Sequence, residues 1–170
     1  GNLWHGISVN DQAQPTLEGN ECKGNRKVGI GYWESAGGVA RQNACSGNGL
    51  HGIDVYDKAQ PTLEGNRCGN NKQVGIRYSD SAGGVARQNV CSGNGLNGIG
   101  VNERAQPTLE NNECKDNGRA GISYWDTAGG VARQNLCSGN RWGIYIEKTA
   151  APELVENDCH DNTEGDIVDP

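Results

Sequence analysis

Apolar and polar positions alternate in short runs that return at a fixed interval along the chain. In each run a Gly-Ile pair is followed by a variable residue and then by a bulky apolar residue, as in GISV from Gly6 and GIDV from Gly52. Successive side chains of an extended strand point to opposite faces, so the isoleucine and the residue two positions later share one face. Because the isoleucine recurs in every run, we predict short β-strands that bury this face.

Cysteines and asparagines show the length of the repeat. The cysteines are 23 residues apart five times and 22 residues apart once, and asparagines recur in two columns at the same interval. A unit of this length is too short for a pair of helices, but it can form one coil of short strands. Stacked coils would place equivalent residues about 4.8 Å apart, where asparagine side chains can hydrogen-bond along the stack. The columns are Cys22, Cys45, Cys68, Cys91, Cys114, Cys137 and Cys159; Asn20, Asn43, Asn66, Asn89, Asn112, Asn135 and Asn157; and Asn25, Asn48, Asn71, Asn94, Asn117, Asn140 and Asn162.

Two alternating versions of the repeat carry a family resemblance. One begins AQPTLEGNECKGN and the other AGGVARQNACSGN, and a short turn and a Gly-Ile pair follow each. They resemble the right-handed parallel β-helix repeats of carbohydrate-binding proteins and sugar hydrolases. The resemblance implies an all-β, single-domain right-handed parallel β-helix, a solenoid of seven 23-residue coils over residues 1–170. Since the chain has no methionine and its first coil has no evident cap, we expect it to be excised from a longer multidomain protein.

The interior is predicted to keep a nearly constant volume from coil to coil. Where the inward residue after isoleucine is valine, a second apolar column has leucine, and where it is tyrosine that column has alanine, as for Tyr32 and Ala40. Tyr32 is therefore placed inside, with its hydroxyl expected to reach a polar partner, and Trp33 is placed outside. The cysteines are interpreted as small core residues with reduced thiols, because side chains in register point in parallel.

Composition narrows the class of partner. The chain has 15 Lys+Arg against 21 Asp+Glu, a formal charge of -6 and a pI of about 5.0. This balance argues against nucleic acid, which needs a concentrated basic surface. No apolar run is long enough for a membrane span or for the core of a signal peptide. A neutral or cationic partner fits this composition better.

Two outward columns consist of charged residues. One alternates glutamate and arginine from Glu18 to Arg133 and predicts a salt-bridge ladder. The other is acidic throughout, so its members should repel unless solvent, Lys58 and Arg104 relieve them or calcium binds between coils. The weak calcium candidates are Asp57 and Asp80, and no other cofactor is expected.

Functional residues are expected where the repeat breaks down. The outward positions beside the valine and tyrosine column vary most, and they combine aromatic rings, hydrogen-bonding groups and two glycines, Gly31 and Gly100, that would leave recesses. An exposed ring among donors and acceptors suits a sugar, whose C–H face stacks while its hydroxyls hydrogen-bond. The predicted carbohydrate-binding residues are Trp33, Asp54, Tyr56, Arg77, Ser79, Asn102 and Trp125.

This face favours a non-catalytic carbohydrate-binding module that holds an extended plant polysaccharide. Trp33 and Tyr56 would stack on sugar rings, while Asp54 and Arg77 would hydrogen-bond hydroxyls or, for Arg77, a uronic acid. No catalytic residue is assigned. Resemblance to β-helical ancillary domains makes a xylan-like hemicellulose the first ligand to test. It also implies a catalytic domain in the same polypeptide and an extracellular or cell-surface location as part of a secreted bacterial enzyme.

Two alternatives stay open. A polysaccharide lyase or glycoside hydrolase of the β-helix type would use the cluster of Asp54, Asp57, Lys58, Arg77 and Asp80, although the short loops offer no wall to exclude water. A structural or protein-interaction spacer would use the uncapped first coil for self-association or for docking on a neighbouring domain.

Overall fold

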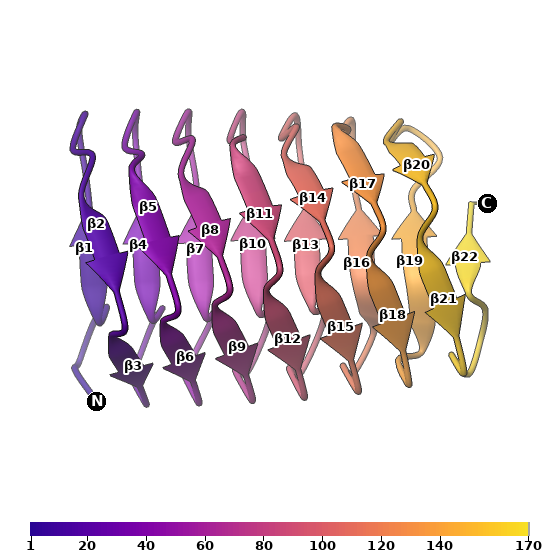
Figure 1. Cartoon of the computed structure of the whole chain (residues 1–170), viewed down its shortest axis with the longest axis horizontal. Helices are drawn as coiled ribbons and strands as arrows, with labels where there is room; N and C mark the ends of the chain where they lie inside the picture. Colours follow the sequence, from indigo (N-terminus) through magenta and orange to yellow (C-terminus); the bar gives the residue numbers. More distant parts are fainter. Residues whose placement is uncertain (170) are drawn as a thin grey trace.

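The computed structural model describes residues 1–169 as one solenoid of 22 short strands (Figure 1). Each strand pairs in parallel with the strand at the same position of the next coil, so three sheets run along the rod. Sheet A contains β1 (Ile7–Val9), β4 (Ile30–Tyr32), β7 (Ile53–Val55), β10 (Ile76–Tyr78), β13 (Ile99–Val101), β16 (Ala120–Tyr124), β19 (Trp142–Ile146) and β22 (Ile167–Val168). Sheet B contains β2 (Thr16–Glu18), β5 (Val39–Arg41), β8 (Thr62–Glu64), β11 (Val85–Arg87), β14 (Thr108–Glu110), β17 (Val131–Arg133) and β20 (Glu153–Val155). Sheet C contains β3 (Glu21–Lys23), β6 (Ala44–Ser46), β9 (Arg67–Gly69), β12 (Val90–Ser92), β15 (Glu113–Lys115), β18 (Leu136–Ser138) and β21 (Asp158–His160).

The register confirms the repeat. Equivalent residues pair across neighbouring coils without a slip, as Ile53 does with Ile30 and with Ile76. The all-β solenoid of about seven 23-residue coils is therefore as the sequence predicts. Within residues 1–169 no helix is long and apolar enough to cross a membrane.

The interior is built from the predicted columns. Tyr32, Tyr78 and Tyr124 are completely buried, and each is in register with a smaller aliphatic residue on the next coil, as Tyr32 is with Val55. All seven cysteines are free, and six of them are buried. The expectation that the tyrosine hydroxyls reach a polar partner is wrong, because all three are buried without one. The backbone groups of these strands are already paired between coils and leave the hydroxyls no acceptor.

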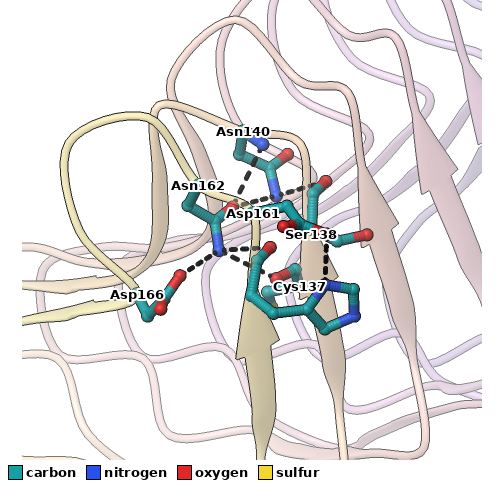
Figure 2. Close-up of polar contacts among 7 residues, drawn as sticks. Cys137, Ser138, Asn140, Asp161, Asn162 and Asp166 are labelled. Carbon is teal, nitrogen blue, oxygen red and sulfur yellow. Dashed lines mark hydrogen bonds and ion pairs between the residues drawn. The ribbon is translucent and has the colours of Figure 1, made fainter.

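Both asparagine columns form hydrogen-bonded ladders. The side-chain oxygen of Asn66 accepts from the backbone N–H and the side-chain amide of Asn43, at 3.0 and 2.9 Å. The Asn66 amide also donates to the carbonyl oxygen of Ala40 at 2.9 Å, so the ladder ties consecutive turns to the strands. Figure 2 shows the C-terminal end of the second ladder, where Asn162 Nδ2 donates to Asp166 Oδ1 at 2.9 Å. A carboxylate there takes the place of the next asparagine.

The charged columns differ from the expectations in detail. The glutamate and arginine strip forms separate ion pairs, each between an arginine and the glutamate one coil earlier, such as Arg41 with Glu18 at 2.8 Å. In the acidic column the carboxylates accept backbone N–H groups from the previous coil, as Asp57 Oδ2 does from Glu34 at 3.0 Å. These hydrogen bonds offset the repulsion between like charges. Among residues 1–169 no three His, Cys, Asp or Glu side chains are placed to hold a metal ion, so calcium at Asp57 and Asp80 stays a prediction.

Candidate functional site

A groove follows the rod axis on the outer face of sheet A. Its floor is the middle outward residue of each sheet A strand, and its edges are the turn residues just before and just after the strand. Two adjoining hollows, of about 490 and 450 Å³, lie along this groove and share Arg77. The seven residues predicted from sequence all line one hollow or the other: Trp33, Asp54, Tyr56 and Ser79 the first, Arg77 both, and Asn102 and Trp125 the second.

An ion pair lies on the floor where the two hollows meet. Arg77 donates from Nε to Asp54 Oδ1 at 2.7 Å and from Nη2 to Asp54 Oδ2 at 2.9 Å. The Asp54 side chain is only 3% exposed and that of Arg77 is 29% exposed. Both carboxylate oxygens of Asp54 are therefore engaged within the protein, while Nη1 of Arg77 has no partner among residues 1–169.

Two histidines line the edge that precedes the strands. His51 lines the second hollow, and its Nδ1 is buried without a hydrogen-bond partner. Burial lowers the pKa of the His51 imidazole to about 4, against a smaller opposing effect of Asp54 and a smaller lowering by Arg77. The pKa of His5 is also lowered, first by burial and then by the charge of Lys27. His51 is consequently neutral at ordinary pH.

On the opposite edge, Trp33 packs against Tyr56 of the next coil and also reaches His5 across the floor. The Trp33 ring centroid lies 5.5 Å from that of His5 and 6.2 Å from that of Tyr56. A Cβ at Gly31 would come within 2.5 Å of the Trp33 ring, so the indole already lies over this glycine. The predicted recess at Gly31 is therefore filled by Trp33. At Gly100 a Cβ would make only ordinary contacts, the nearest at 3.5 Å with Val74, so no side chain fills this recess, which borders the second hollow.

Sequence reasoning missed the residues of the edge that precedes the strands. Lys27 and Leu50 line the first hollow, and His51, Leu96 and Arg119 line the second. All five occupy positions one or two residues before a Gly-Ile pair, where the strand alternation does not determine which way a side chain points. The two positions before each Gly-Ile pair vary in residue type as much as the outward strand positions from which the site was predicted. This variation could have identified them as candidate site residues.

The carboxylates of the groove are all held by the protein. Glu103 accepts from the backbone N–H of Asp80 at 2.5 Å and from the Ser79 hydroxyl at 3.3 Å. Asp126 accepts from the backbone N–H of Glu103 at 3.2 Å, and Glu147 accepts from that of Asp126. Each of these carboxylates, Asp54 included, therefore has a hydrogen-bond donor within the protein.

Three parallel sheets, two asparagine ladders and a groove along one sheet define a parallel β-solenoid. The chain belongs to the right-handed β-helix family, since the family described as right handed beta helix region matches residues 2–95 and 73–168. This match confirms the resemblance seen in the repeats. Comparison with curated protein sequences gives no match.

Solved structures with this fold include two epimerases. The A-module of the Azotobacter vinelandii mannuronan C-5 epimerase AlgE4 matches with a TM-score of 0.86 and 18% identity, over 97% of this chain and 52% of that one. The periplasmic alginate epimerase AlgG matches with a TM-score of 0.86 and 19% identity, over 92% and 42%. The catalytic domain of Agl-KA matches with a TM-score of 0.60 and 13% identity, over 97% and 44%. At these identities the likeness establishes the fold, and the chain spans about half the length of the proteins it matches.

The prediction of a non-catalytic carbohydrate-binding module is wrong on this comparison. The three matched structures are named as epimerases or as a catalytic domain, which favours the enzyme alternative. The short loops predicted from sequence offer no wall that could exclude water from a reaction. In the structure the walls are side chains of the turns, such as Trp33 and Leu50, rather than inserted loops.

Proposed function

We propose that this chain belongs to an enzyme that acts on an extended acidic polysaccharide and epimerises its uronate units at C5. The observation that carries the proposal is the arrangement of four side chains on two neighbouring coils. His51 stands at one edge of the floor, Tyr56 stands at the other edge, and the Asp54–Arg77 pair lies between them. A sugar over this pair would have a neutral base on one side and a phenol on the other.

The chemistry requires three groups. His51 accepts the C5 proton, and the electron pair of the broken C–H bond moves into the carboxylate to form an enediolate. The free N–H groups of Arg77 offset the charge that develops there, as preorganised donors do in other enzymes. Tyr56 then donates its hydroxyl proton to the opposite face of C5, which inverts that centre, and exchange with water restores both side chains. Cleavage of the C4–O4 bond from the same intermediate, with O4 leaving as a protonated hydroxyl on the neighbouring sugar and a C4=C5 double bond formed, would instead make the enzyme a lyase.

Cationic side chains in the groove support an acidic ligand although the whole chain is acidic. Lys27, Arg77 and Arg119 all line the two hollows, and the acidic residues beside them are held in hydrogen bonds to the protein. A neutral or cationic partner, expected from net charge alone, would leave the Arg119 guanidinium without a counter-charge, since no carboxylate pairs with it among residues 1–169. Net charge describes the whole surface, whereas recognition depends on the groups inside the groove.

The surroundings of the enzyme are part of the proposal. The name of AlgG places that protein in the periplasm, and we extend an extracytoplasmic location to this chain. A further domain in the same polypeptide is consistent with a chain that spans about half of the matched proteins. Self-association through the first coil stays a prediction.

Solvent exchange tests the reaction directly. The purified chain would be incubated in D2O with polymannuronate, polyguluronate, polygalacturonate and xylan, and proton NMR would follow the C5 position. We expect deuterium at C5 of a uronate polymer, without new reducing ends. His51→Gln should abolish the exchange and Tyr56→Phe should abolish the inversion at C5, while His160→Gln, a histidine change outside the groove, should affect neither.

Other outcomes would redirect or overturn the proposal. Unsaturated products with new reducing ends would identify a lyase, and saturated products with new reducing ends a hydrolase. Binding of uronate polymers without any exchange at C5 would overturn the proposed reaction for this chain. Binding of xylan alone would overturn the acidic ligand as well.

A further inference from the structure

The groove ends at its C-terminal side in a cluster of one arginine and three aromatic rings. Arg119 Cζ lies 5.3 Å from the ring centroid of Trp125 and 5.9 Å from that of Trp142. The Tyr145 ring lies 4.8 Å from Trp125 and 4.9 Å from Trp142. Arg119 and Trp142 come from the edge that precedes the strands and Trp125 from the edge that follows them, so the cluster crosses the floor.

The single deletion in the repeat builds this cluster. The turn before β19 is one residue shorter than the others, and the carbonyl oxygen of Arg119 accepts the backbone N–H groups of both Arg141 and Trp142, at 2.8 and 3.0 Å. Trp142 thereby pairs in register with Ala120. A bulky ring stands at the edge position where the previous coil has a methyl group.

The floor beneath the cluster is closed. Ser123 is completely buried, and its hydroxyl has no partner. The next floor residue is Tyr145, whose ring fills the space between the two tryptophans. One coil earlier the floor residue is Gly100, which borders the second hollow. An extended ligand lying over Gly100 therefore meets a wall at the next coil.

Arg119 has the features of a carboxylate receptor. Two indole rings fix its guanidinium, and no carboxylate lies within ion-pair distance of it among residues 1–169. Asp126 and Glu147 line the same hollow but accept backbone N–H groups. Arg141 offers a contrast, since it also stacks on Trp142, at 4.4 Å, but its Nε pairs with Glu164 at 2.7 Å. A stacked, unpaired guanidinium presents a planar set of donors that matches a carboxylate.

We infer that Arg119 binds the carboxylate of a terminal uronate and that the aromatic cluster stops the groove there. An acidic oligosaccharide would then lie along the groove with one chain end at the sixth coil. The identity of the ligand as a uronate rests on the proposed function, whereas the closed end rests on the cluster itself.

Two arginine variants and two oligomers, one charged and one reduced, test whether Arg119 binds a carboxylate. Titration calorimetry would measure the binding of a defined oligouronate and of the same oligomer with its carboxyl groups reduced to alcohols. Loss of a charge-assisted hydrogen-bonding pair predicts that Arg119→Gln weakens oligouronate binding about 10- to 100-fold and leaves the reduced oligomer unaffected. Arg141→Gln, the matched control, should change neither by more than about twofold. Equal effects of Arg119→Gln on both oligomers would overturn the carboxylate assignment.

End-blocked ligands test the wall. Oligouronates with a bulky fluorophore on either the reducing or the non-reducing end would be compared, and we expect one tag to abolish binding and the other to be tolerated. Trp142→Ala should rescue the blocked ligand, and it should fold because Ala120 occupies the equivalent position. Tolerance of both tags by the wild-type protein would overturn the closed end. Binding that follows these expectations without exchange at C5 would refute the proposed reaction and leave the subsite standing.

Discussion

Arg77 holds Asp54 of the preceding coil through two parallel hydrogen bonds, from Nε at 2.7 Å and from Nη2 at 2.9 Å. The two residues are register partners on neighbouring sheet A strands, so the strand pairing places their Cα atoms side by side. A carboxylate that is 3% exposed needs such a partner, because a buried charge without one is costly. The same contact fixes the plane of the guanidinium and leaves Nη1 without a partner among residues 1–169.

Removing one partner of this pair should harm stability more than removing both. Arg77→Ala leaves the Asp54 carboxylate unpaired on the floor, and we expect a loss of about 1–3 kcal/mol in the free energy of unfolding. Asp54→Ala combined with Arg77→Ala should recover part of that loss. Urea unfolding followed by far-UV circular dichroism measures both. A double variant less stable than Arg77→Ala would contradict the assignment of the cost to an unpaired carboxylate.

Gly31 and Gly100 offer a matched pair of substitutions on the floor. Gly31→Ala would bring a methyl group within 2.5 Å of the Trp33 ring and force the indole away, whereas Gly100→Ala meets its nearest neighbour at an ordinary 3.5 Å. We therefore expect Gly31→Ala to shift tryptophan fluorescence and Gly100→Ala to leave it nearly unchanged. Gly100→Ala should instead narrow the second hollow and weaken ligand binding there. Identical emission spectra for wild type and Gly31→Ala would show that Trp33 does not rest on this glycine.

The alternation along the chain was enough to place Tyr32 inside and Trp33 outside, because strand geometry leaves no other choice once the isoleucine face is buried. It also located the floor of the groove and the edge that follows the strands, since departures from a repeat are visible in a single sequence. It could not show that Asp54 and Arg77 bind each other rather than a ligand, because both rotamers depend on the neighbouring coil. His51 and Arg119 escaped notice for a different reason, which is that turn residues follow no alternation.

The asparagine ladders should contribute most to the free energy of unfolding in the middle of the rod. Asn66 is completely buried and takes part in bonds to Asn43, Ala40 and Asn89, so Asn66→Ala leaves several buried groups unpaired. We expect a loss of about 2–4 kcal/mol in unfolding free energy for Asn66→Ala. Asn162→Ala, at the more exposed end shown in Figure 2, should cost about 1 kcal/mol. Thermal unfolding of the two variants measures the difference, and equal losses would contradict a cost set by burial.

The buried neutral state of His51 should make stability depend on pH in a defined window. Its pKa is lowered to about 4 in the folded chain, while in the unfolded chain it is about 6.5. Between these values the unfolded state binds a proton that the folded state does not. This contribution is therefore fully present above about pH 6.5 and is lost as the pH falls toward about 4, on the order of 3 kcal/mol in total. His51→Val, which copies Val28 and Val74 at the equivalent positions, should remove most of that slope and leave the smaller contribution of His5. Urea unfolding at a series of pH values measures the slope, and an unchanged slope in His51→Val would show that His51 is protonated within the fold.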